Sequence, residues 1–198
     1  MIDFEPYRRG EKTLPEIATG LTRADLARLT QEMCNLQLQL LSAIEDADVV
    51  FTPDDPEAND TFAATSEEVG ISWTLGHVIV HTTASSEEAA ANALNLARGV
   101  GVLGRSRFEV PWQSVHTAEQ IRARVDESRQ MRLAMLQAWP DQPNVDLTYT
   151  AREGTAPRNA VAQFISGLSH DDSHLEQVRR IVIEAREARE KGLSLIHI

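Results

Sequence analysis

Four stretches of the chain carry apolar residues at intervals of three and four, and this periodicity restricts the fold more than any other feature. The spacing places the apolar side chains on one face of an α-helix. It is clearest in the first stretch, which contains Leu26, Leu29, Met33, Leu36 and Leu40. We expect helices over residues 22–47, 72–98, 117–139 and 159–191. Loops that contain proline and glycine separate them, so the sequence predicts an all-α fold, a four-helix bundle with long inter-helix connections.

Capping residues support the predicted helix ends. Thr117 is followed three residues later by Gln120, which fits the Ser/Thr-x-x-Glu/Gln capping box. Thr22 and Asp25 have the same spacing, and Ser72 is the expected cap of the second helix. Between the third and fourth helices, residues 145–150 alternate weakly and predict a short extended segment.

The length of 198 residues fits a single domain, which we place at residues 1–192 with a helical core at about 22–190. The last six residues, LSLIHI at 193–198, follow a highly charged run and match the translation of a common transposon-end adapter. We therefore expect this tail to be non-native and the natural C-terminus to be missing, and we give His197 no role.

The formal net charge of −11 and the lack of a basic cluster argue against binding to nucleic acid or to an anionic membrane. There is no apolar run of the length of a transmembrane helix, and residues 1–10 do not resemble a signal peptide. The single Cys34 cannot form an internal disulfide and falls in an apolar stripe, where a free cysteine acts as a small hydrophobe. Together these features predict a cytoplasmic protein.

Two histidine pairs carry the chemical signal: His77 with His81, and His170 with His174. Each pair has the i,i+4 spacing that places both rings on one face of a helix, where two imidazoles can bind one metal ion. A buried histidine satisfied by a hydrogen bond is the alternative for any one of them. Two ligands from one helix and a third from a facing helix would give a site with three protein ligands and an open position.

The strings around these histidines resemble a known family. WTLGHVIVH, residues 73–81, is similar to the start of the second helix in DinB-like (YfiT-like) metal-binding bundles, where a tryptophan precedes the first ligand histidine by eight residues. HDDSHLEQV, residues 170–178, resembles the later H-x-x-x-H of that family, with a glutamine three residues past the second histidine. The resemblance implies His81, His170 and His174 as ligands of a divalent ion, and it implies a homodimer. It gives His77 no ligand role.

Other residues are weaker candidates. Glu88 lies two turns beyond His81 on the same helical face and is either a partner of the site, a base or a solvated side chain. Arg132 falls within the apolar stripe of the third helix. It either extends outward to solvent or sits in the pocket and binds a carboxylate of a substrate or cofactor. Asp171 and Asp172 lie between the ligand histidines; either one of them orients an imidazole, or, as we expect, both lie on the flank of their helix.

Three functions remain open from the sequence. The first is a metal-dependent enzyme acting on a small-molecule substrate; the family resemblance implies either a transferase or isomerase that uses a low-molecular-weight thiol, or a hydrolase. The second is a non-catalytic metal-binding or stress-response bundle with a structural ion, for which His77 would be the fourth ligand. The third is a metal-free bundle that acts through a partner surface. Zinc, nickel, iron and manganese all accept imidazole, so the sequence does not distinguish among them.

Overall fold

Four long helices form the body of the protein in the computed structural model, which describes residues 1–56, 58–59, 66–102 and 109–196. These helices are α3 (Arg23–Leu40), α5 (Leu75–Ala97), α6 (Ala118–Gln137) and α7 (Ala160–Ile196). Within the described residues there is no β-strand, only an isolated antiparallel bridge between Tyr149 and Arg158. The predicted all-α class is confirmed, and the extended segment predicted at 145–150 is reduced to this single bridge.

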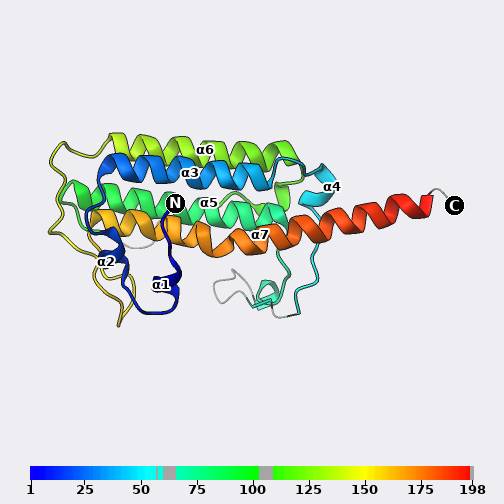
Figure 1. Ribbon diagram of the computed structural model, residues 1–198, viewed down its shortest axis with the longest axis horizontal. Coiled ribbons are helices and arrows are strands. Elements are labelled where there is room, and N and C mark those ends of the chain that lie inside the picture. Colours follow the sequence, from blue (N-terminus) through cyan, green and yellow to red (C-terminus); the bar gives the residue numbers. More distant parts are fainter. Residues whose placement is uncertain (57, 60–65, 103–108, 197–198) are drawn as a thin grey trace.

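The long helices lie side by side, as Figure 1 shows, and α7 extends past the other three at its C-terminal end. Helix α5 contacts α6 and α7, and α3 contacts the same two helices. Each long helix therefore packs its apolar face against two neighbours. In the part of the chain that the structure describes, none of the helices combines the length and apolar character needed to cross a membrane.

The capping signals in the sequence correspond to real helix ends. The hydroxyls of Thr22 and Thr117 accept hydrogen bonds from the backbone amides of Asp25 and Gln120, three residues further on in each case. The second long helix begins slightly later than predicted, because Thr74 rather than Ser72 is its cap. The threonine hydroxyl there accepts from the amide nitrogen of His77, at 3.2 Å.

The prediction that the first helix continues to residue 47 is wrong. Helix α3 ends at Leu40, and a separate short helix, α4 (Asp46–Val49), follows. The backbone amide of Glu45 donates to the carboxylate of Asp48 at 2.8 Å, which starts the new helix. The break turns Val49 inward, where it is fully buried at the end of the helical body.

Two further short helices precede the first long one: α1 (Glu5–Arg8) and α2 (Leu14–Ala18). Helix α2 packs against α7 and buries Leu14 to 2% exposure. Two 3₁₀ turns, η1 (Ser66–Glu68) and η2 (Trp112–Ser114), lie in the connections before α5 and before α6. Residues 57, 60–65 and 103–108 of those predicted loops lie outside the described residues, as do His197 and Ile198 of the expected non-native tail.

The core consists of two apolar clusters with polar residues between them. One cluster gathers the residues nearest α2, among them Leu26, Met33, Leu96, Leu136, Phe164 and Ile165. The other gathers those nearest α4, among them Leu41, Leu75, Ile79, Ile121, Val125 and Ile181. Along α5 and α6 most of the buried residues that separate the clusters are polar, and only Ala84 and Ala89 are not: the polar ones are Thr82, Thr83, Ser86, Ser128 and Arg132. The candidate site lies at this polar level.

Helices α5 and α7 approach each other closely near this level. A Cβ atom on Gly167 would lie 3.0 Å from both the Cα of Ser86 and the Cβ of Ala89. A contact of this length is tighter than nine in ten real Cβ contacts, so a larger residue at position 167 would push α5 and α7 apart by a few tenths of an ångström. Because α5 and α7 carry the predicted ligands, this contact sets their separation within one turn of His170.

Candidate metal centre

His81 on α5 and His170 and His174 on α7 meet between the two helices. One ring nitrogen from each residue lies within 4.8 Å of the other two. The i,i+4 spacing on α7 places its two rings on the same face, and α5 presents the third ring opposite them. The convergence predicted for these three side chains is confirmed.

The distances suit a single ion. The Nε2 atoms of His81 and His170 are 3.2 Å apart. Two imidazole nitrogens bound tetrahedrally to one ion at about 2.0–2.1 Å lie about 3.3 Å apart. Two ligand atoms of one ion can be at most about 4.2 Å apart. A pair at the 4.8 Å limit would have to approach by about 1.5 Å to reach the tetrahedral spacing, whereas the pair His81 and His170 already has it.

Polar partners orient the far sides of two of these rings. Nδ1 of His174 lies 2.7 Å from the amide oxygen of Gln177, which can only accept, so the ring donates from Nδ1 and keeps a lone pair on Nε2. Nδ1 of His81 lies 3.5 Å from a carboxylate oxygen of Glu109, at ion-pair distance. Partners of this kind fix the tautomer of a metal-ligating histidine and raise its basicity.

Burial favours the neutral, metal-binding form of His174. It lowers the pKa of this ring, assisted by the neighbouring His81, while Gln177 and Asp171 act in the opposite direction. A histidine with a lowered pKa is unprotonated at neutral pH, and an unprotonated imidazole is the form that ligates a metal. The site is therefore prepared to bind a cation without first losing a proton from this ring.

A column of aromatic rings covers one side of the cluster. His77 stacks between Trp73, at 4.4 Å between ring centroids, and Trp112, at 4.7 Å. Trp73 also stacks on His174, at 5.9 Å, and contacts His81 at 4.6 Å. His77 is consequently a member of this column, and among the described residues it does not belong to the group whose ligand atoms meet.

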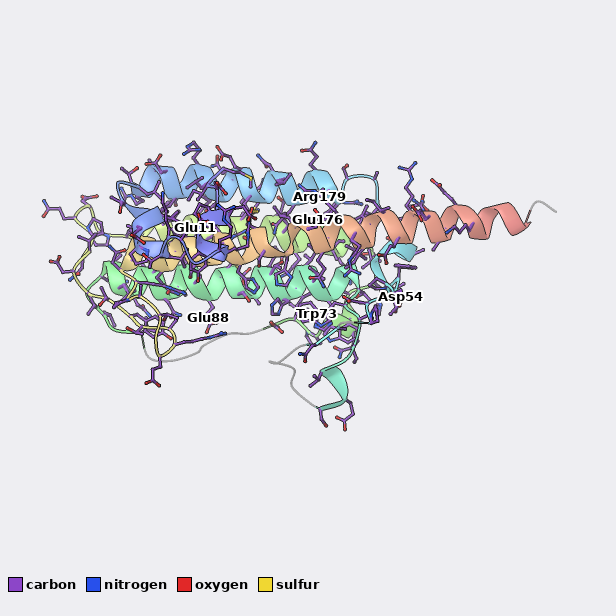
Figure 2. The ribbon with its side chains drawn as sticks, turned by 60° about the horizontal axis from the view of Figure 1, so that its bottom comes forward. Glu11, Asp54, Trp73, Glu88, Glu176 and Arg179 are labelled. Atoms are coloured by element: carbon purple, nitrogen blue, oxygen red, sulfur yellow. The ribbon has the colours of Figure 1, made fainter. Side chains whose placement is uncertain are left out.

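Glu88 lies away from the cluster. It is on α5 seven residues beyond His81, which corresponds to about 10 Å along the helix axis. Figure 2 shows Trp73 at the start of α5 and Glu88 well along the same helix. It is not in the group of ligand atoms that meet. Its role as a base stays a prediction, and this position gives it no support.

Arg132 does not extend to solvent, which excludes the first of the two alternatives left open for it. The residue is 1% exposed on α6. Its Nη1 donates to Asp171 at 2.7 Å, Nη2 to the Cys34 sulfur at 2.8 Å and Nε to the Ser128 carbonyl at 3.4 Å. Arg132 does bind a carboxylate, but one of the chain itself. Its role toward a cofactor or substrate stays a prediction, against which this burial argues.

The carboxylate that Arg132 binds belongs to Asp171, which we expected on the flank of α7. That expectation is wrong. Asp171 is 1% exposed and faces the interior, while the neighbouring Asp172 pairs with Arg8 at 2.5 Å. Ser86 donates a second hydrogen bond to Asp171, at 2.8 Å. Burial raises the pKa of the Asp171 carboxyl, and Arg132 and Ser86 oppose that rise by stabilising the carboxylate.

Cys34 is buried, as the sequence predicts, and we expect it to be inert. It is 0% exposed, and burial raises the pKa of its thiol despite the nearby Arg132. Because the raised pKa keeps the sulfur protonated at pH 8 and the thiolate is the reactive form, the native protein should barely react with a thiol reagent. Labelling should become complete in denaturant. Native labelling at the rate of an unfolded control would contradict this expectation.

Two partners of the cluster were given no role from the sequence, although one of them, Gln177, is the glutamine of the family pattern. Gln177 follows His174 by three residues, which places it on the same helical face, so its spacing was available as a signal. Glu109 lies in the connection between α5 and α6, where no periodicity relates it to His81. Only the path of that connection brings the carboxylate to the ring.

An all-α chain whose two adjacent helices present three converging imidazoles belongs to the class of helical proteins with a histidine cluster that could hold a metal ion. Comparison with protein families matches the chain to the DinB superfamily over residues 7–178. The match spans most of the sequence, and the chain belongs to the DinB superfamily. No curated protein and no solved structure is significantly similar to it.

Proposed function

We propose that the chain is a metal-dependent enzyme with a DinB-type four-helix bundle, in which His81, His170 and His174 hold one divalent ion. The observation that carries the proposal is the mutual distance of their ligand atoms, all within 4.8 Å. Gln177 and Glu109 add to it, because they face the ring nitrogens on the far side and leave the near nitrogens for the ion.

The number of ligands favours an enzyme over a structural site. Structural zinc sites normally use four protein ligands, whereas catalytic sites use three and keep a position for water or substrate. The group of meeting ligand atoms found among the described residues has three members, and His77, the candidate fourth ligand, is stacked between two indoles instead. The non-catalytic alternative therefore lacks its expected ligand.

The chemistry follows from an open position beside three imidazole ligands. A divalent ion bound there supplies Lewis acidity, which lowers the pKa of a water or a low-molecular-weight thiol at the open position. The side chains of the protein hold and shield the reacting group: Gln177 orients His174, and Trp73 covers one side of the rings. Such a site suits transfer or isomerisation with a thiol, or hydrolysis with water, on a small electrophilic substrate.

A metal titration tests the proposal. After treatment with a chelator and dialysis, the full chain should take up one equivalent of Zn²⁺ or Ni²⁺ at pH 7, measured by elemental analysis and calorimetry. A His116→Ala variant is the matched control, because His116 is exposed in a loop before α6 and should bind metal as the wild type does. Failure of the wild type to bind either ion would contradict the proposed function.

A second assay distinguishes the two nucleophiles. The metal-loaded protein is incubated with an electrophilic substrate, with and without a small thiol, and both thioether formation and hydrolysis are followed. Turnover that requires the thiol assigns a transferase, whereas turnover in its absence assigns a hydrolase. The absence of both reactions over a broad electrophile panel, with metal bound, would favour the non-catalytic alternative.

A further inference from the structure

A buried charged network lies beside the histidine cluster. Arg132 on α6 and Asp171 on α7 form an ion pair of 2.7 Å whose side chains are 2% and 0% exposed. The other carboxylate oxygen of Asp171 accepts a hydrogen bond of 2.8 Å from Ser86 on α5. Three helices thus meet at one carboxylate, and a fourth, α3, contributes Cys34 at 2.8 Å from the guanidinium.

This network joins the two helices that carry the ligands. Asp171 directly follows His170 on α7, and Ser86 lies on α5 five residues after His81. The Ser86 hydroxyl is also 3.0 Å from the carbonyl oxygen of Gly167, at the closest approach of α5 and α7. The polar contacts and the glycine contact therefore fix the separation and register of the two helices at the level of the ligands.

Stability alone is a poor reason for such a network. The desolvation of two buried charges offsets much of their attraction, and well-packed apolar residues of similar volume often stabilise a fold as well or better. The apolar clusters on both sides show that this chain has apolar residues to fill its interior. The charged pair between the two clusters therefore needs an explanation other than stability. The candidate functional residues nearest to the pair are the ligand histidines.

We propose that Asp171, held by Arg132 and Ser86, is a positioning residue that fixes His170 and His174 against His81. It thereby sets the affinity and the coordination geometry of the metal centre. Asp171 does not belong to the group of ligand atoms that meet, so it acts through the helices and not by binding the ion. This inference rests on the proposed function, because it describes how the chain shapes that same site.

The test replaces the charged pair by apolar residues, Arg132→Met with Asp171→Leu, in the full chain. The matched control is Arg124→Met with Glu87→Leu, which removes another ion pair between α6 and α5. Each protein is titrated with Co²⁺ in competition with a chromophoric chelator, and the visible absorption of the bound Co²⁺ reports its coordination geometry. We expect the Arg132/Asp171 double variant to bind Co²⁺ roughly 10–100-fold more weakly and with a changed spectrum. The control should match the wild type in both respects.

The outcomes separate the two proposals. If the wild type binds no Co²⁺, the proposed function fails and the positioning role fails with it. If the wild type binds and the folded double variant has the same affinity and spectrum, only the positioning role is overturned. Should the double variant not fold, Ser86→Ala decides. This variant removes one hydrogen bond to Asp171, and it should weaken Co²⁺ binding and shift its spectrum; an unchanged affinity and spectrum would overturn the inference.

Discussion

Replacing His174 with alanine is expected to weaken the binding of a divalent ion roughly 100-fold. Four-ligand zinc-finger sites bind their ion with about 10–16 kcal/mol, or about 3 kcal/mol per ligand, which corresponds to roughly two orders of magnitude in affinity. His174 contributes one of three ligand atoms, and burial keeps its pKa low, so the wild-type ring competes little with protons. Calorimetric titration at pH 7 with Zn²⁺ measures the loss directly.

The histidines outside the cluster provide the controls for this prediction. His77→Ala should retain wild-type affinity, because His77 stacks between Trp73 and Trp112 and is not in the ligand group. If His77→Ala lost metal to the same extent as His174→Ala, His77 would be a fourth ligand and the structural-ion alternative would regain its support. Equal metal binding by His174→Ala and the wild type would remove the site itself.

The sequence predicts the long helices because their signals are local. Apolar periodicity and threonine caps act within a few residues, so the starts of α3 and α6 at Thr22 and Thr117 could be assigned from the sequence. The break after Leu40 was missed, although the spacing of Glu45 and Asp48 marks it. An apolar stripe that continues across a turn looks the same as one that continues along a helix.

In the candidate site, too, the residues with local sequence signals were predicted and the contacts between helices were not. The i,i+4 pair His170 and His174 is a local pattern, and the family resemblance supplied His81. The position of Arg132 was left open, because a charged residue in an apolar stripe does not reveal its partner, and Asp171 is 39 residues away in the sequence. Pairings across helices depend on which faces meet, and periodicity along one helix carries no information about that.

Replacing Arg132 alone, by methionine, is expected to lower the free energy of unfolding by about 3–5 kcal/mol. Methionine fills a similar volume, so the cost comes from Asp171, whose carboxylate loses its 2.7 Å partner while it remains 0% exposed. Without Arg132, Ser86 and His174 still counter the rise that burial imposes on the pKa of Asp171, and protonation of the carboxyl would limit the cost of the unpaired charge. Urea denaturation followed by circular dichroism measures the change.

Two comparisons make this prediction specific to the buried pair. Arg179→Met removes the partner of Glu176 on the outer face of α7, where the side chains are 45% and 84% exposed, and solvent screening should leave the stability nearly unchanged. The double variant with Asp171→Leu should recover most of the stability that Arg132→Met loses, because no charge is then left unpaired in the interior. If the single and the double variant unfolded at the same urea concentration, the loss would come from packing around residue 132. If the double variant regained stability but not metal affinity, the fold would not need the charged network. The network would then serve the geometry of the three histidines.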